Sequence, residues 1–195
     1  YKIPTAGWAT VTTPEEAEKA AADIGYPVVV KADSESIVHK SDMGGVAVNL
    51  GDADAVRAAV TDMQSKFQAD DLKFLVQKFT PGGTEVIIGA KAEEGLGHLI
   101  MFGMGGIYVE VLKDVVFNLT PLTTAEAAEM LSEIRLAPLL EGVRGQQGVD
   151  REGLQEVLLR LSQLLADLPQ IQELDLNPTL AFADRVCAVD ARMSL

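Results

Sequence analysis

The 195-residue sequence is short of cysteine, histidine and basic residues. Its one cysteine, Cys187, excludes an internal disulfide framework and a multi-thiolate metal site, and fits a reducing cytoplasm. Only 16 Lys and Arg residues oppose 29 Asp and Glu residues, so the formal net charge is -13. Because binding to nucleic acid or to an acidic membrane surface needs a positive field, we expect neither partner.

A membrane-length apolar run and a starting methionine are also missing. No apolar stretch approaches the ~20 residues that cross a bilayer, and no signal peptide is evident. Hydrophobic residues nevertheless make up 48% of the chain, which predicts a soluble globular protein of one large domain or two lobes. The sequence begins with YKIP at Tyr1, so we expect a piece of something longer.

Capping residues predict four helices. Thr13, Asp52, Thr123 and Asp150 each stand where an N-cap side chain would accept a backbone hydrogen bond, and Glu16 follows Thr13 at the spacing of a capping box. The helices are expected over residues 13–24, 53–68, 123–135 and 151–168.

Short apolar runs between these helices predict strands. PVVVK is nearly all apolar, as in a central strand covered on both faces, and ends at Lys31. In GVAVNL the alternation of Val46, Val48 and Leu50 predicts that these three share a buried face. Near the end of the chain, IQELDLNPTLAF and VCAVDAR flank a turn at 183–185 and predict a hairpin.

Glycine-rich segments indicate a boundary and a close contact. The Pro-Gly-Gly turn near residues 78–83 separates an expected first lobe, 1–78, from a second, 79–195. In the second lobe, glycines at positions 103, 105 and 106 interrupt a strand, which suggests close approach of the backbone to a ligand or another chain.

Lys31, Gly44 and Gly45 together suggest a phosphate clamp. A lysine at the exit of a buried strand meets phosphate oxygens as a point charge, and glycines in a turn let backbone N–H groups approach an anion. The alternative is an ordinary Gly-Gly turn between strands. The sequence has no GxxxxGK[ST] motif, and its other glycines lack the spacing of a dinucleotide fingerprint.

A second cluster of polar residues lies near the end of the chain. Asp175 and Asn177 are two apart, so on a strand they point to the same face, and Asp190 falls on the partner strand of the predicted hairpin. Nucleotide-bound magnesium takes one or two protein oxygens, which suits such a sparse set. The alternative is a turn that begins before Pro178.

The chain has two histidines, and His39 has the more suggestive surroundings. A neutral imidazole is a competent nucleophile near pH 7 and carries a phosphoryl group when a carboxylate orients its other nitrogen. By its spacing alone, His39 is equally a solvated loop residue. His98 begins an apolar strand, and we expect it to be structural.

Seven blocks carry a family resemblance: VVVKA, IVHKSDMGGVAVNL, VQKFTPGGTEVIIGA, MFGMGGIYVEVLKD, LLEGVRG, LDLNPTL and VDAR. In this order they resemble the ATP-grasp part of the NDP-forming acyl-CoA synthetases, the acetate–CoA ligase (ADP-forming) group related to succinyl-CoA synthetase. The resemblance covers essentially the whole chain. It implies an α+β fold of two lobes with mainly antiparallel sheets, binding ATP or ADP and Mg²⁺.

The resemblance also implies roles for individual residues. His39 matches the phosphohistidine of a relay loop, Asp175 the acid that steadies it, and Asn177 and Asp190 the magnesium ligands. The nucleotide contacts implied in the same way are Lys31, Gly44, Gly45, Gln77, Lys78, Phe79 and, less directly, Glu85.

The implied activity is that of an acid–thiol ligase. Acyl-CoA, ADP and phosphate are converted reversibly to a carboxylic acid, CoA and ATP through a phosphohistidine. The CoA site is not among these blocks, so the expected partner is a CoA-binding α subunit or fused CoA-binding domains, in the cytoplasm. The sequence departs from the family pattern at Lys2, in YKIP instead of YGIP, and at Asn118, in FNLTP where the family carries an arginine.

Two alternatives remain. The first is a regulatory module, an ATP-grasp-like region fused to a protein lysine acetyltransferase. The second is a purely structural domain that holds its neighbours together. Retention of His39, Asp175, Asn177 and Asp190 favours catalysis, whereas Asn118 favours the regulatory alternative.

Overall fold

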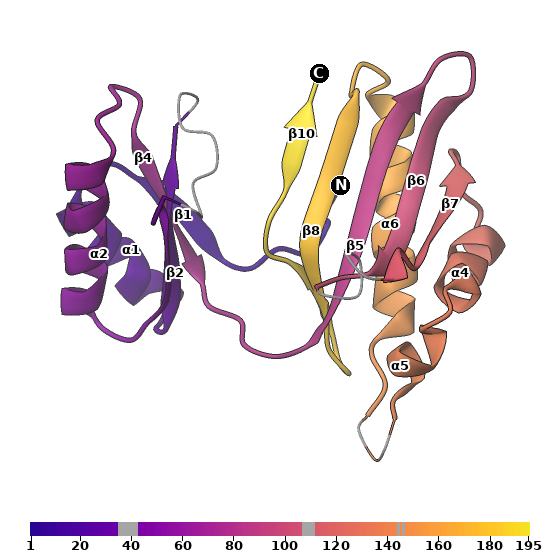
Figure 1. Ribbon diagram of the computed structural model, residues 1–195, viewed down its shortest axis with the longest axis horizontal. Helices are drawn as coiled ribbons and strands as arrows, with labels where there is room; N and C mark the ends of the chain where they lie inside the picture. The colour runs from indigo at the N-terminus through magenta and orange to yellow at the C-terminus, as the bar shows by residue number, and fades with distance from the viewer. Residues whose placement is uncertain (35–42, 107–111, 144, 146) are drawn as a thin grey trace. The chain divides into compact units, whose positions relative to one another are not determined.

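The structure is a computed structural model that describes residues 1–34, 43–106, 112–143, 145 and 147–195 (Figure 1). It divides into a first unit, Ala6–Pro81, and a second unit, Gly82–Leu195 together with Tyr1–Thr5. The chain passes between the units twice, once between Thr5 and Ala6 and once within the Pro-Gly-Gly turn. Among the described residues, no helix is long and apolar enough to span a membrane.

The first unit is an antiparallel sheet with two helices on one face (Figure 1). Val28 and Val30 pack in the core with Val60, Met63 and Phe74, and the central position predicted for their strand is confirmed. The strands, in sheet order, are β1 (Trp8–Val11), β4 (Lys73–Lys78), β2 (Val28–Asp33) and β3 (Val46–Leu50), and the helices are α1 (Pro14–Ile24) and α2 (Ala53–Lys66).

The predicted buried face of β3 is correct for Leu50 but wrong for Val48. Val48 is 60% exposed, whereas Ala47 and Leu50 pack against the core. The register with β2 steps from Val28–Leu50 to Val30–Ala47, which leaves one extra residue in β3, and Asn49 has φ 57. This bulge shifts the alternation by one residue, so period-two patterning fails here.

The predicted N-caps are confirmed. At the first helix, however, the Glu16 side chain does not bond the backbone N–H of the N-cap residue Thr13, as a capping box requires. Thr13 accepts from the Glu16 N–H at 3.2 Å, while the Glu16 carboxylate accepts from the Thr12 N–H at 2.9 Å. The full capping box forms instead in the second unit, where Thr123 and Glu126 bond each other's backbone N–H. Local capping signals therefore located the helix starts correctly.

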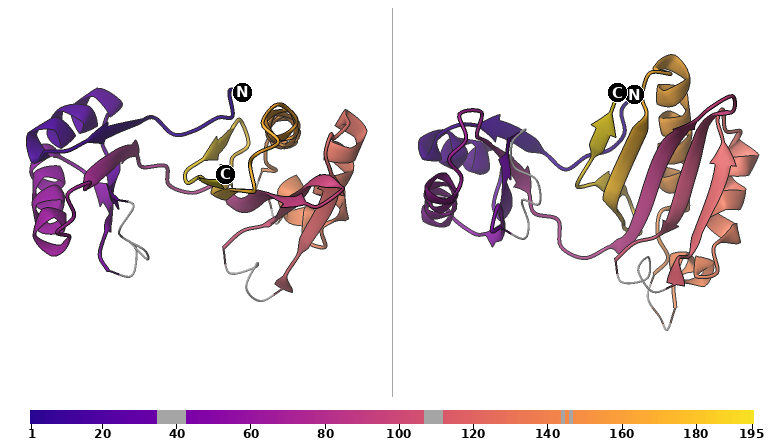
Figure 2. Two further views of the ribbon diagram at one scale, coloured as in Figure 1. Left: turned by 90° about the horizontal axis from the view of Figure 1, so that it is seen from above. Right: turned by 45° about the horizontal axis from the view of Figure 1, so that its top comes forward.

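The second unit is an antiparallel sheet with three helices on one face (Figures 1 and 2). Leu158 and Leu161 of the longest helix pack against Ile88, Ile100 and Phe102 of the sheet. The path through the sheet is β10 (Arg192–Ser194), β8 (Glu173–Ala181), β5 (Thr84–Glu93), β6 (Gly97–Met104) and β7 (Val115–Leu119), with β9 (Val186–Ala188) also on β8, and the helices are α4 (Thr124–Glu133), α5 (Ala137–Glu141) and α6 (Arg151–Asp167).

Helix α4 ends two residues before the predicted end because a buried carboxylate binds the backbone that follows it. Asp114 is 6% exposed and accepts from the N–H groups of Arg135 and Leu136, each at 2.8 Å. These bonds hold the chain in the turn from which α5 starts. A buried acid from the segment just before β7 thus decides where this helix ends.

Gly103 in β6 and Gly105 just after this strand are required by close contacts within the chain itself. A Cβ on Gly103 would lie 2.6 Å from the Asp114 carbonyl oxygen, and a Cβ on Gly105 would lie 2.9 Å from the Glu85 carbonyl carbon. The Gly105 N–H also donates to the Glu85 carbonyl at 2.7 Å. The close approach predicted here is therefore to neighbouring strands, without a need for a ligand or another chain.

Candidate functional site

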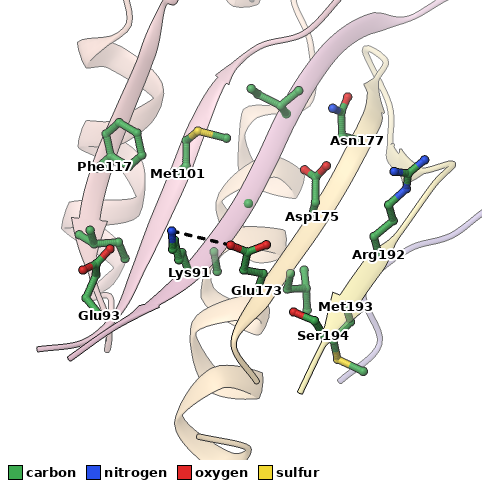
Figure 3. Close-up of a pocket in the computed structure, with 15 residues that line it drawn as sticks. Lys91, Glu93, Met101, Phe117, Glu173, Asp175, Asn177, Arg192, Met193 and Ser194 are labelled. Atoms are coloured by element: carbon green, nitrogen blue, oxygen red, sulfur yellow. Dashed lines mark ion pairs between the residues drawn. The ribbon is translucent and has the colours of Figure 1, made fainter. Parts of the chain in front are cut away.

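The open face of the second-unit sheet holds a pocket of about 690 Å³ (Figure 3). Leu174 and Leu176 of β8 pack in the core beneath the sheet, so the alternating residues Asp175 and Asn177 stand on the opposite face. Both side chains line the pocket, which also has an apolar wall that includes Met101 and Phe117. The pocket thus combines an apolar surface with a polar end.

The predicted hairpin is confirmed, with one correction. Strand β8 runs through Pro178 without turning, which removes the alternative of a turn there. Strand β9 pairs with β8, but Asp190 lies beyond it, between β9 and β10, and so is not on a partner strand. The residue placed opposite Asp175 is instead Arg192 of β10.

Asp175 is half-buried, and three neighbouring side chains affect the pKa of its carboxyl group. Burial raises the pKa of its carboxyl group above the ordinary value, and the negative charge of Asp190 adds to that rise. The hydrogen bond from the Asn177 side chain and the positive charge of Arg192 oppose the rise in pKa. Asn177 and Asp190 therefore each lie close enough to Asp175 to affect the pKa of its carboxyl group.

Replacing Asp175 with asparagine should stabilise the nucleotide-free, metal-free protein at neutral pH. Because the folded pKa of Asp175 lies above its unfolded value, its ionisation costs stability above that pKa, and the cost vanishes below the unfolded pKa near 3.8. We expect Tm to rise at pH 7 by no more than about 2 °C, because the half-exposed carboxyl group is screened by solvent and 1 kcal/mol corresponds to about 2–4 °C in proteins of this size.

Calorimetric scans in EDTA at pH 7 and below pH 4 measure this effect. Asp184→Asn is the matched control, because Asp184 is an exposed carboxylate at the β8–β9 turn, and its Tm should change less. An Asp175→Asn protein whose Tm at pH 7 equals the wild-type value would contradict the predicted cost.

Asp175, Asn177 and Asp190 fit a nucleotide-bound Mg²⁺. The set offers hard oxygen donors, and a bound cation would offset both the burial of the Asp175 carboxylate and the smaller repulsion from Asp190, which together raise the pKa of Asp175. Within the described part of the chain, no group of three His, Cys, Asp or Glu side chains could hold a metal by itself. A site this sparse suits Mg²⁺ that shares its coordination with phosphate oxygens and water.

The first unit places Lys31 beside the Gly-Gly turn. The N–H of Ala32 donates to the Gly45 carbonyl at 2.7 Å, and Lys31 pairs with Val46 across β2 and β3. Gly44 has φ +77, a conformation that favours glycine. The members of the predicted clamp are therefore neighbours, and His39, within 35–42, lies outside the described residues.

The segment Gln77–Phe79 is firmly bonded within the first unit. Gln77 is buried in β4, and the N–H groups of Lys78 and Phe79 donate to the carbonyls of Gly7 and Pro27 at 2.8 and 3.1 Å. The Lys78 ammonium donates to two more carbonyls, those of Gly25 and Tyr26, at 2.9 and 2.7 Å. The backbone N–H groups of Lys78 and Phe79 are therefore already used within the unit.

Three further residues of interest lie in the second unit. Glu85 is the second residue of β5, and its carboxylate lies against Gly106, where an added Cβ would be 2.9 Å from the Glu85 Oε2. Asn118 is on β7 beside the pocket-lining Phe117, and its side-chain oxygen accepts from its neighbour's N–H at 2.8 Å. His98 is buried with its Nε2 2.7 Å from the Ile171 carbonyl, which confirms its structural role.

Sequence comparison agrees with this fold. The profile of the ATP-grasp domain matches residues 1–195. The chain is 42% identical over 200 residues to the β subunit of acetate–CoA ligase [ADP-forming] I of Pyrococcus furiosus, with 100% of this chain and 86% of that subunit covered. It belongs to this ATP-grasp family.

The ATP-grasp domain also matches longer enzymes. It is 42% identical over 199 residues to acetate–CoA ligase [ADP-forming] I of Archaeoglobus fulgidus. That match covers 100% of this chain but 29% of the Archaeoglobus protein. The domain thus corresponds to most of a separate β subunit and to less than a third of a longer ligase.

Solved structures confirm the ATP-grasp fold. The dinucleotide-forming acetyl-coenzyme A synthetase 1 of Ca. Korarchaeum cryptofilum, in complex with coenzyme A, Ca-AMPCP and HgCl⁺, superposes with TM-score 0.91 at 37% identity, over 99% of this chain and 86% of that one. A second complex of that enzyme, with coenzyme A and Mg-AMPPCP and its phosphohistidine segment pointing towards the nucleotide site, gives TM-score 0.90 at 38% identity, over 100% and 86%.

Proposed function

We propose that this ATP-grasp domain is the nucleotide-binding and phosphoryl-relay part of an ADP-forming acyl-CoA ligase. The reaction is acyl-CoA, ADP and phosphate to carboxylic acid, CoA and ATP, and it is reversible. The observation that carries the proposal is the gathering of Asp175, Asn177 and Asp190 beside a pocket, in a chain that matches a ligase β subunit over its whole length. The location we expect is the cytoplasm.

A CoA-binding partner completes the enzyme in this proposal. The domain covers 29% of a longer relative, and the related synthetase structures contain coenzyme A. We therefore expect either a CoA-binding α subunit or fused CoA-binding domains to handle the acyl-CoA and acid, while this chain handles the nucleotide.

His39 is the proposed phosphoryl carrier and Asp175 its orienting acid. As the imidazole nitrogen bonds to the terminal phosphorus of ATP, the bond from phosphorus to the bridging oxygen breaks, and ADP leaves with that electron pair. A carboxylate that accepts a hydrogen bond from the other ring nitrogen keeps the imidazole oriented and stabilises its positive charge. The Asn177 hydrogen bond and the Arg192 charge help to keep Asp175 ionised for this task.

The remaining residues bind the nucleotide. Lys31 and the backbone of Gly44 and Gly45 would meet its phosphates from the lobe that we assign to residues 1–78. The base would lie against the segment Gln77–Phe79, through Gln77, Lys78 and Phe79. Glu85 would meet the ribose. Glu85 and the acid cluster belong to the proposed lobe 79–195.

Asn177 and Asp190 would hold the magnesium ion. When bound with the nucleotide, Mg²⁺ screens phosphate charge and so lowers the barrier to phosphoryl transfer. The side chains contribute neutral and anionic oxygens, and Asp190 is close enough to Asp175 to affect its pKa.

ATP synthesis tests the proposed function. The complete ligase, supplied with a short-chain acyl-CoA, ADP, phosphate and Mg²⁺, should form ATP and release CoA in equal amounts, measured by coupled luminescence and a thiol assay. Omission of phosphate should stop both. Folded, Mg²⁺-loaded enzyme that makes no ATP from a panel of short-chain acyl-CoAs would refute the proposal.

The regulatory alternative is not favoured. The relatives that match the whole domain are ligases, both as a separate β subunit and as a longer protein. Mass spectrometry of a lysine-containing acceptor protein in the same reaction measures acetyl transfer, and we expect none.

A further inference from the structure

Arg192 stands in the active-site cluster, although the motif-based assignments leave it without a role. It lies on β10 directly opposite Asp175 in the antiparallel pairing with β8. Directly opposed residues of paired strands project to the same face. Both side chains line the pocket together with Asn177, and Figure 3 shows Arg192 extending beside those two residues.

The Arg192 guanidinium lies close enough to Asp175 to affect its pKa, but the two side chains do not form an ion pair. Its positive charge lowers the pKa of Asp175. Within the part of the chain that the structure describes, however, it forms no ion pair within 4.0 Å and no hydrogen bond. By contrast, Arg57, Arg151 and Arg160 are each paired with a glutamate. The donors of Arg192 are therefore available to a ligand in the pocket.

The chemistry of the site favours a phosphoryl group as that ligand. A guanidinium donates two parallel N–H bonds to neighbouring phosphate oxygens, a geometry that a lysine ammonium does not offer. The other cation of the pocket, Lys91, pairs with Glu173 at 3.8 Å. Arg192 is thus the pocket cation that lies next to the proposed phosphoryl-transfer acid.

We propose that Arg192 binds the terminal phosphoryl group of the nucleotide, donating hydrogen bonds to its non-bridging oxygens. The inference rests on the proposed function, since it places the ATP terminus beside Asp175. There Arg192 would hold the group that is transferred and supply positive charge that the sequence motifs attributed to Lys31 and Mg²⁺ alone. ADP lacks that group, so Arg192 should distinguish ATP from ADP.

Calorimetric titration of the complete ligase with Mg²⁺ and two nucleotides tests this proposal. The probes are the β,γ-methylene analogue of ATP, which cannot transfer its phosphoryl group, and ADP. Arg192→Met should weaken binding of the analogue about tenfold, the effect of one charge-assisted hydrogen bond, and that of ADP less than about twofold. Arg192→Lys keeps the positive charge but loses the two parallel N–H donors. Its loss of affinity for the analogue should lie between those of the wild type and Arg192→Met.

Lys91→Met is the matched control, because it removes a cation from the same pocket at a position paired with Glu173. It should bind both nucleotides like the wild type. Arg192 is exposed on an edge strand, so its variants should melt within a degree or two of the wild type.

The outcomes separate this inference from the proposed function. Unchanged analogue binding in Arg192→Met, equal weakening of both nucleotides, or the same loss in Lys91→Met would overturn the role of Arg192. Selective weakening in an enzyme that never forms phosphohistidine would support Arg192 and overturn the relay. A wild type that binds neither nucleotide would overturn both.

Discussion

Replacing His39 with alanine should abolish the acid-labile phosphate that the complete ligase acquires from γ-labelled ATP. If His39 is the first acceptor, no label should reach any other histidine of the enzyme, because the path from the nucleotide runs through this imidazole. Loss of a nucleophile removes its covalent step altogether, so ATP synthesis should fall by at least about 10³-fold. Rapid quenching in base, followed by peptide mapping, measures the label.

His98→Gln is the control for this experiment, since His98 is the second histidine of the chain. Its buried Nε2 lies 2.7 Å from the Ile171 carbonyl, and a glutamine amide can donate to the same oxygen. Label should persist in His98→Gln at the wild-type stoichiometry. Retention of acid-labile phosphate in a folded His39→Ala enzyme would refute the relay.

Removing the charge of Asp190 should raise the Mg²⁺ requirement of that labelling. Asp190→Asn keeps the size of the side chain but replaces an anionic ligand by a neutral one, and magnesium prefers carboxylate oxygens. We expect the Mg²⁺ concentration for half-maximal labelling to rise at least about tenfold, in line with the cost of weakening a metal site. Asn177→Ala, which deletes the other proposed ligand, should act in the same direction.

Asp184→Asn is the matched control for the metal experiment. Asp184 is an exposed acid at the β8–β9 turn and pairs with its neighbour Arg185 at 3.1 Å. Its removal subtracts the same charge from the same unit without touching the cluster. If Asp190→Asn and Asp184→Asn show the wild-type Mg²⁺ dependence, Asp190 is not a magnesium ligand.

Local signals in the sequence predicted the helices well. An N-cap side chain such as Asp52 satisfies donors only three residues away, and the structure shows its bond to the Ala55 N–H at 2.8 Å. Helix ends were harder, because the end of α4 depends on Asp114, which reaches it from a separate part of the chain. The buried face of β3 failed for a related reason, since the bulge at Asn49 belongs to its pairing with β2.

Some features of the site could be predicted from the sequence, whereas others could not. Spacing alone placed Asp175 and Asn177 on one strand face, because side chains alternate along any strand. It also predicted that Lys31 and the Gly44–Gly45 turn act together, and the structure places that turn directly before β3, the strand that pairs with β2 at Lys31. Arg192 was missed, although its position two residues after Asp190 was a signal, because its significance depends on the pairing partner of β10.

The sequence by itself determined the helix starts, the alternating strands, the membership of the ATP-grasp family and the chemical types of the site residues. Each depends on neighbours in the chain or on a linear pattern. Only the tertiary structure decided that Arg192 stands opposite Asp175, that burial raises the pKa of Asp175, and that Gly103 and Gly105 allow neighbouring segments of the chain to approach closely. Those facts depend on strand register and burial, which arise when distant segments pack together.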